Sequence, residues 1–123
     1  MTMRRIVFLF LVAAAVTSGA AAASAHAFLD HALPAVGSTS HGSPPELRLW
    51  FTQELEPAFS TVKVVDAGGK QVDKGDASVD AQDHKLLKVS LPPLAPGAYK
   101  VMWRVTSVDT HTTSGSFPIQ IAP

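Results

Sequence analysis

Cysteine is absent from the 123 residues of this chain. The chain can therefore form neither a disulfide framework nor a thiolate metal site, and its apolar core alone must hold a small domain together. Neither sign of charge is in excess, with 10 Lys and Arg against 10 Asp and Glu. No basic stripe or basic aromatic platform occurs, which excludes the usual nucleic-acid binding surfaces.

The first 25 residues have the pattern of a cleavable signal peptide. Two arginines at positions 4 and 5 precede eleven uncharged apolar residues, 6–16, and the small residues Ala-Ser-Ala occupy positions 23–25. A membrane-spanning helix needs roughly 20 apolar residues, so an uncleaved anchor is the less favoured alternative. We expect export with cleavage after position 25, by the general or the twin-arginine route. Residues 26–123 would then form one small mature domain.

Apolar and polar side chains alternate in several short segments of this domain. Such alternation with period two is typical of half-buried strands. The segments are 47–51, 62–64, 87–91, 99–105 and 117–121. Proline- and glycine-rich turns separate them, and no convincing helical period occurs after the signal peptide. The pattern predicts an all-β fold of six to seven strands.

Strands this short and this closely spaced predict an antiparallel sandwich or Greek-key barrel, and we expect a small immunoglobulin-like Greek-key β-sandwich. Tyr99 follows a Pro-Gly pair and resembles the tyrosine corner of such sandwiches, in which the phenol hydroxyl bonds to an upstream backbone group. Trp103 on the same face is expected in the core. Pro118 predicts that the last strand lies at a sheet edge, because proline cannot donate to a ladder.

Cleavage after position 25 would make His26 the first residue of the mature chain. A terminal histidine offers a metal both its free α-amine and its ring Nδ1, which together close a chelate ring. The α-amine has an ordinary pKa of about 7.7–8.0, so it gives up its proton to a metal at modest cost near neutrality. Phe28 stands third, which excludes the amino-terminal copper chelate that needs histidine there.

Asp109 and His111 are the best candidates for further ligands. They are two positions apart, so in an extended chain their side chains lie on one side, roughly 6.5–7 Å apart. The segment follows the strongest predicted strand and precedes Gly115, which predicts a hairpin loop or the start of a strand. Taken alone, an Asp-x-His pattern is equally typical of a solvated turn.

The mature chain resembles the periplasmic copper-binding CopC family over its whole length. The resemblance rests on HAFL (26–29), LPAVGS (33–38), PPELRL (44–49), FTQ (51–53), PGAY (96–99), WRVTSVDTH (103–111) and GSF (115–117). It implies a small Greek-key β-sandwich in the bacterial periplasm that binds copper and takes part in copper tolerance or uptake. It also implies that the Cu(II) ligands are the amine and ring of His26, Asp109 and His111.

This ligand set agrees with coordination chemistry. Nitrogen and carboxylate ligands in a tetragonal arrangement favour Cu(II), whereas zinc prefers a tetrahedron. Some members of the family carry a methionine-rich loop for Cu(I), but here two of the three methionines leave with the signal peptide and Met102 stands alone. We therefore expect no separate Cu(I) site. At Gln53 relatives often have glutamate, an expected outer hydrogen-bond partner of the site, so Gln53 keeps the hydrogen bonding but lacks the charge. Glu54 could supply that charge as a second outer partner, although neighbouring residues on a strand point in opposite directions.

The leading hypothesis is a non-enzymatic exported protein that binds one Cu(II) ion for sequestration, tolerance or delivery. An inner-membrane copper transport protein is the expected partner, and the expected state is a monomer. Two alternatives stay open: a copper enzyme that uses an amino-terminal histidine brace for oxidative cleavage of polysaccharides, and a metal-free immunoglobulin-like module. His31, His41 and His84 are expected at the surface, because none has a partner at metal-binding spacing.

Overall fold

The computed structural model describes residues 26–123, so the predicted signal peptide lies outside the described residues. The described chain is almost entirely β-structure, as the sequence predicted. Its strands are β1 (Leu29–Leu33), β2 (Thr39–His41), β3 (Glu46–Phe51), β4 (Thr61–Asp66), β5 (Ser78–Val79), β6 (Leu86–Ser90), β7 (Gly97–Thr106) and β8 (Thr112–Ala122). A single 3₁₀ turn, η1 (Pro57–Phe59), precedes β4. No helix in residues 26–123 has the length and apolar character needed to cross a membrane.

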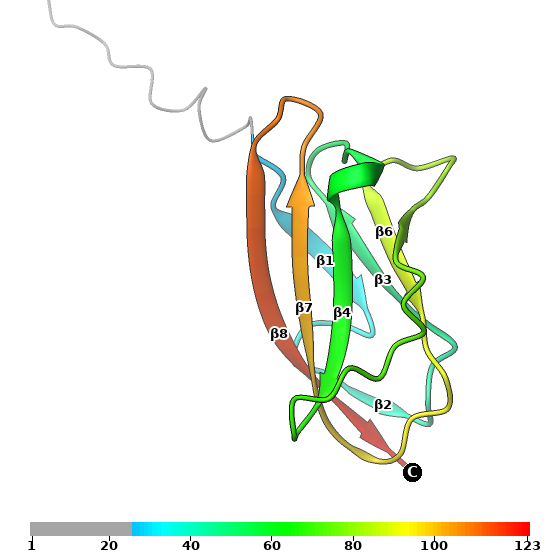
Figure 1. The fold of residues 1–123 in the computed structure, drawn as a ribbon. Helices are drawn as coiled ribbons and strands as arrows, with labels where there is room; N and C mark the ends of the chain where they lie inside the picture. Colours follow the sequence, from blue (N-terminus) through cyan, green and yellow to red (C-terminus); the bar gives the residue numbers. More distant parts are fainter. Residues whose placement is uncertain (1–25) are drawn as a thin grey trace, which may run out of the picture.

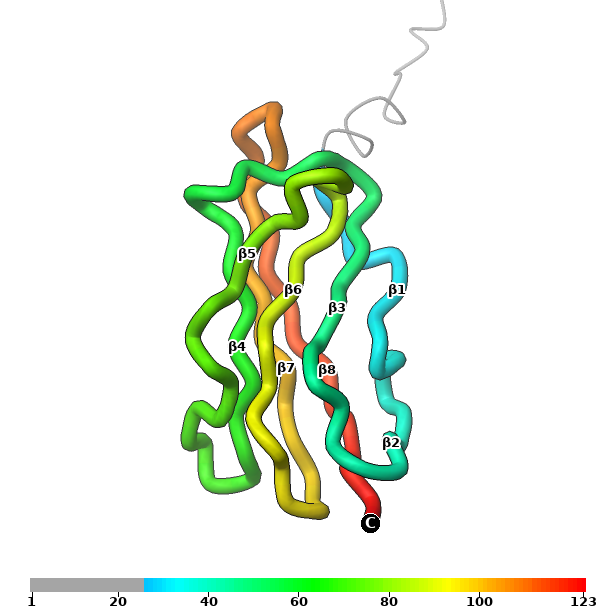
Figure 2. Tube along the Cα trace, turned by 90° about the vertical axis from the view of Figure 1, so that its right-hand side faces the viewer, coloured from blue at the N-terminus to red at the C-terminus, as the bar shows by residue number. Residues whose placement is uncertain are grey.

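The strands form two four-stranded sheets that pack face to face (Figures 1 and 2). One sheet has the order β1-β3-β6-β5 and the other β2-β8-β7-β4. All neighbours are antiparallel except β2 and β8, which are parallel. Successive strands lie in opposite sheets except for β5 with β6 and β7 with β8, so the chain crosses between the sheets five times. The predicted antiparallel sandwich is therefore confirmed.

The strand count exceeds the six to seven predicted from sequence. The additional strands are the short ones, because β2 has three residues and β5 has two. Segments of this length are too short to show a period of two. Pro118 lies in β8, which is second in its sheet rather than at the edge. However, β2 pairs only with Gln120, Ile121 and Ala122, which come after Pro118 in β8. The proline nitrogen, which cannot donate a hydrogen bond, is therefore not needed in the ladder with β2.

The core lies between the inner faces of the sheets, where the alternating apolar residues meet. Its fully buried side chains include Leu47, Leu49, Leu87, Val101 and Ile119. Each comes from a strand whose outward neighbours are more exposed, so the alternation in sequence maps onto the two faces of each sheet. Burial of these side chains supplies the main stabilisation of a domain without disulfides.

Two predicted aromatic roles are visible at this core. The hydroxyl of Tyr99 donates a hydrogen bond of 2.5 Å to the carbonyl of Ala95, which confirms the tyrosine corner. Trp103 packs against the core from a partly buried position, with its ring edge-on to Phe51 at 5.1 Å between centroids. Its indole also covers Gly115 on β8, where a Cβ atom would lie 2.5 Å from Trp103 Cζ2. A glycine is therefore required beneath the tryptophan.

The two ends of the sandwich differ in what they carry. The described chain begins beside the loop between β7 and β8, at the top of Figure 1, and the carboxyl terminus lies at the opposite end. The start of the chain and the 107–111 loop are far apart in sequence but meet at one end of the fold. This end carries the candidate metal ligands, and we call it the site end.

Candidate metal centre

Residues 107–111 form a closed turn between β7 and β8. The amide of Ser107 donates to the carbonyl of His111 at 2.9 Å, and the amide of Thr110 donates to the carbonyl of Ser107 at 2.8 Å. Thr110 has a φ of 76°, an unfavourable conformation for a β-branched residue. Its backbone reverses the chain between Asp109 and His111. The predicted hairpin loop is confirmed.

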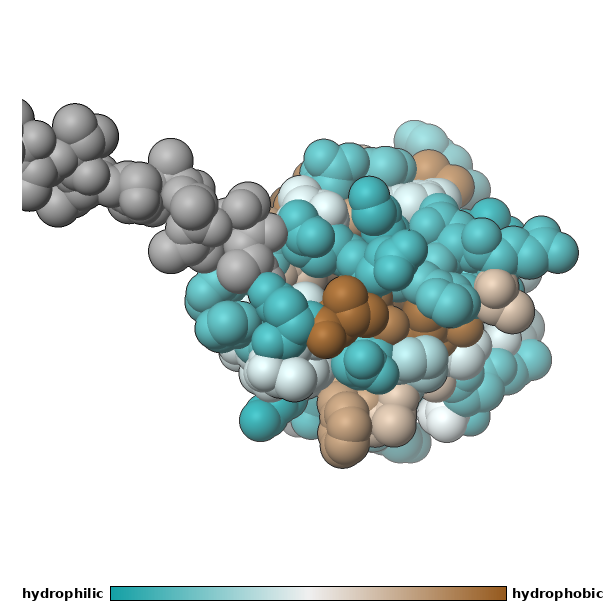
Figure 3. All heavy atoms as spheres, turned by 90° about the horizontal axis from the view of Figure 1, so that it is seen from above, coloured by the Kyte–Doolittle hydropathy of each residue, from teal (hydrophilic) through white to brown (hydrophobic). Residues whose placement is uncertain are grey.

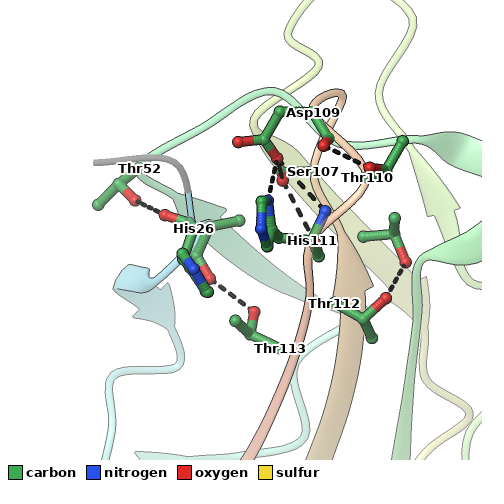
Figure 4. Close-up of polar contacts among 10 residues, drawn as sticks. His26, Thr52, Ser107, Asp109, Thr110, His111, Thr112 and Thr113 are labelled. Carbon is green, nitrogen blue, oxygen red and sulfur yellow. Dashed lines mark hydrogen bonds and ion pairs between the residues drawn. The ribbon is translucent and has the colours of Figure 1, made fainter. Parts of the chain in front are cut away.

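This turn brings the side chains of Asp109 and His111 together. Asp109 Oδ1 lies 3.4 Å from His111 Nδ1, so the two side chains face one another (Figure 4). The extended geometry, with roughly 6.5–7 Å between the two residues along the strand, does not apply here. The reason is the reversal at Thr110, which replaces strand geometry with that of a turn.

The buried side chain of Ser107 contacts both Asp109 and His111 within the turn. Its side chain is only 1% exposed, and its hydroxyl donates a short hydrogen bond to Asp109 Oδ1. The same hydroxyl lies 3.3 Å from the carbonyl of His111. The hydrogen bond from Ser107, together with the amide and ring of His111, lowers the pKa of Asp109 below its ordinary value, against a smaller opposing effect of desolvation. The carboxylate, which is the form that binds a metal, therefore persists to more acidic pH than in an ordinary aspartate.

His26 meets this turn from the other side of the site end. Its imidazole ring lies against that of His111 in a tilted arrangement, with 4.6 Å between centroids and 33° between the planes. The ring of Phe28 stacks on that of His26, with 6.1 Å between centroids and 21° between the planes. The structure therefore brings together all three side chains that the sequence singled out as candidate ligands: His26, Asp109 and His111.

These three side chains match a metal in chemistry but are not arranged around a common point. Among residues 26–123, no group of three or more His, Cys, Asp or Glu has the geometry to hold a metal ion. The imidazoles of His26 and His111 face each other, and Asp109 faces the ring of His111. The side chains of Asp109 and His111 are 39% and 52% exposed, so they have room to rotate. Two imidazoles, a carboxylate and a terminal amine would form a donor set suited to Cu(II).

Gln53 and Glu54 follow β3 at the same end of the fold. Glu54 reaches the 107–111 turn through its backbone, because its carbonyl accepts a hydrogen bond of 3.1 Å from the amide of Val108. Within the described part of the chain, neither side chain is hydrogen-bonded to a candidate ligand. Their role as outer hydrogen-bond partners of the site stays a prediction.

The remaining histidines lie on the surface. His31 Nδ1 is 2.6 Å from Asp30 Oδ2, and its ring stacks on Trp50 at 4.4 Å. His41 and His84 are exposed. In residues 26–123, none of the three contacts His26, Asp109 or His111.

The backbone around His26 is held by threonine hydroxyls that the sequence analysis missed. Thr52 accepts the amide of Phe28 at 3.0 Å, and Thr113 donates to the carbonyl of Ala27 at 2.6 Å. Ser107 and Thr110, which shape the turn, were missed as well. Exposed and half-buried Ser and Thr are common in β-sandwiches, so no signal in one sequence marks these four as different from the others.

The site end is open to solvent. Viewed from above, it is hydrophilic around small apolar patches (Figure 3). Phe28 and Val108, which flank the candidate ligands in sequence, are each 50% exposed. A metal ion could therefore reach this end of the domain without any movement of the core.

Comparison with known proteins places these features in a family. Residues 29–122 match the CopC domain model. Protein YobA of Escherichia coli K12 is 35% identical over 98 residues, which are 79% of each chain. Copper resistance protein C of Pseudomonas syringae pv. tomato is 32% identical over 127 residues, covering 98% of this chain and 99% of that one. The crystal structure of CopC from Methylosinus trichosporium OB3b aligns with a TM-score of 0.75 at 35% identity, covering 80% of this chain and 95% of that one.

Proposed function

The chain belongs to the CopC domain family, and on that premise we propose that it is an exported protein that binds one Cu(II) ion. The ligands are the α-amine and ring of His26, the carboxylate of Asp109 and the ring of His111. The observation that carries the proposal is the meeting of these three side chains at one end of the sandwich, although His26 and Asp109 are 83 positions apart in the chain. Copper-related names among its relatives support the choice of metal.

Cu(II) suits this site better than other ions. Imidazole, amine and carboxylate are borderline to hard ligands, and Cu(II) stands at the top of the divalent affinity order. A carboxyl group is ionised at neutral pH, and the hydrogen bond from Ser107 lowers the pKa of Asp109 further, so the side chain can bind a metal there without first losing a proton. The site has no thiolate, and Met102 on β7 is the one methionine of the described residues. Soft-ligand stabilisation of Cu(I) is therefore absent.

The proposed role is to hold and pass on copper rather than to use it in catalysis. The protein acts as a monomer in the periplasm, where it sequesters Cu(II) or delivers it to a membrane copper transport protein. Asp109 supports binding over catalysis, because a carboxylate ligand fills a coordination position that an oxygen-activating copper site needs to keep open. The exposed site end supports transfer, because a partner can approach the ligands directly.

The first test is mass spectrometry of the exported protein with and without copper. We expect a chain that begins at His26 and gains the mass of one copper ion. A chain that begins elsewhere, or that gains no copper, would refute the proposed site.

The second test measures Cu(II) affinity by competition with a chelator. His26→Ala, Asp109→Ala and His111→Ala should each weaken binding, whereas the control His84→Ala should not. One extra residue before His26 converts the amine into an amide while the imidazole remains, so affinity should fall sharply with circular dichroism unchanged. Unchanged affinity in the extended protein would show that the amine is not a ligand.

A further inference from the structure

Residues 26–28, at the start of the proposed mature chain, have a defined position in the structure that β-strand pairing alone does not explain. A terminal residue has chain on one side only, and termini fray unless other groups tie them down. His26 precedes β1, so no ladder hydrogen bond of that strand reaches it. A chelate that uses both its amine and its ring nevertheless requires a defined backbone direction.

Two threonines supply that direction. The hydroxyl of Thr52 accepts the amide of Phe28 at 3.0 Å and lies 3.5 Å from the carbonyl of His26. The amide of Thr52 donates to the carbonyl of Phe28 at 2.9 Å. From the other side, the hydroxyl of Thr113 donates to the carbonyl of Ala27 at 2.6 Å. Each of the residues 26–28 is therefore bonded to a threonine. Figure 4 shows Thr52 and Thr113 on either side of His26.

The two threonines come from opposite sheets. Thr52 directly follows β3 of one sheet, and Thr113 lies in β8 of the other. Ala27, between them, is completely buried, so its carbonyl has no easy replacement partner in water. Residues 26–28 are thus hydrogen-bonded to both sheets, through Thr52 on one side and Thr113 on the other.

Thr113 also connects the two histidines. It stands two residues after His111, and β8 begins at Thr112. One stretch of chain therefore places the imidazole of His111 and fixes the peptide group next to His26. This link explains why the centroids of the two rings are only 4.6 Å apart although the histidines come from opposite ends of the mature sequence.

We infer that Thr52 and Thr113 are positioning residues for the metal site, and we call them the threonine clamp. This inference rests on the proposed function. The clamp holds residues 26–28 so that the amine and ring of His26 stand beside His111 before copper arrives. Because the terminus is already ordered, copper binding does not have to bear the full entropic cost of ordering it.

Thr113 offers a substitution pair that separates hydrogen bonding from packing. Thr113→Val keeps the shape and loses the hydroxyl, whereas Thr113→Ser keeps the hydroxyl and loses a methyl group. The net effect of one hydrogen bond corresponds to about a tenfold change in affinity. We expect Thr113→Val to weaken Cu(II) binding about tenfold, and Thr113→Ser to bind nearly as the wild type does.

The experiment measures Cu(II) affinity of the exported, processed protein by chelator competition. Circular dichroism melting of the metal-free proteins reports folding, and the Cu(II) electron paramagnetic resonance spectrum reports ligand geometry. Thr61→Val is the matched control, because Thr61 is exposed on β4 and lies outside the clamp. The control should leave both affinity and spectrum unchanged, whereas Thr113→Val should change both.

Wild-type affinity in a folded Thr113→Val protein, or a Thr113→Ser protein as weak as Thr113→Val, would overturn the clamp. If Thr113→Val does not fold, Thr52→Val provides the same test, because Thr52 is more exposed than Thr113. Weaker Cu(II) binding by Thr52→Val supports the clamp, and unchanged Cu(II) binding refutes it. Failure of the proposed function gives a different result, because the wild type itself would then bind no Cu(II). If the wild type binds and His26→Ala weakens it, but neither valine variant does, only the clamp is wrong.

Discussion

Gly115→Ala tests how tightly the two long strands pack beneath the site. A Cβ at position 115 would lie 2.5 Å from Trp103 Cζ2 and 2.8 Å from Cε2. Carbon atoms pack best at about 3.5–4.0 Å, so the indole would have to move by about 1 Å. Phe51 stands edge-on to that indole at 5.1 Å and limits the movement.

The expected cost follows from two opposing effects. Overpacking of this kind destabilises by about 1–3 kcal/mol. Replacing glycine by alanine inside a strand returns about 0.5–1 kcal/mol of backbone entropy. Taking the middle of each range, we expect Gly115→Ala to lower the free energy of unfolding by about 1 kcal/mol. The Tm should fall by about 4–8 °C for each kcal/mol. Urea denaturation followed by circular dichroism measures the change.

A second background identifies the tryptophan as the cause. In Trp103→Leu the indole is gone, so the penalty of Gly115→Ala should shrink or disappear. Ser114→Ala, on the exposed face of the same strand, should change stability little. An unchanged denaturation midpoint in Gly115→Ala, or an equal penalty in the Trp103→Leu background, would refute the packing argument.

Three further outcomes are expected. Ser107→Ala removes the main cause of the lowered pKa of Asp109, so that pKa should rise toward its ordinary value. The stabilisation that the ionised Asp109 carboxylate gives the fold is present above the unfolded-state pKa of about 3.9 and is lost as pH falls through the lower folded-state pKa. Ser107→Ala should bring these two pKa values closer together, as an NMR titration of the Asp109 carboxyl would show. An unshifted titration would contradict the role given to Ser107. Tyr99→Phe loses the bond to Ala95 and should cost about 1 kcal/mol; an unchanged thermal melt would argue against the corner. Reduction with ascorbate in the presence of a Cu(I) chelator should remove copper from the protein. Retention of Cu(I) would contradict a site that binds Cu(II) only.

The sequence predicted the features that depend on local pattern. Alternation in residues 99–105 and 117–121 located the long strands β7 and β8, because each inward side chain repeats at the pleat period. Tyr99 was assigned correctly, since its partner Ala95 lies only four residues upstream. His26, Asp109 and His111 were singled out by their chemistry, and the fold places them together.

The features that were missed depend on contacts far apart in the chain. Thr113 bonds to Ala27 across 86 positions, and Thr52 bonds to Phe28 across 24. No periodicity in one sequence records such a pair. The left-handed conformation of Thr110 could not be predicted either, because β-branched residues rarely adopt a positive φ. Asp109 and His111 therefore flank a turn rather than lying along an extended strand.

The opposite placement of the two ends of the described chain has a practical consequence for anyone who handles this protein. Affinity tags, fluorescent fusions and surface attachment all add mass to one end of a chain. Attached after Pro123, they would sit at the far end of the sandwich from His26 and leave the site end pointing into solution (Figure 1). A sensor chip loaded through the carboxyl end would thus present the molecules with their proposed metal ligands outward.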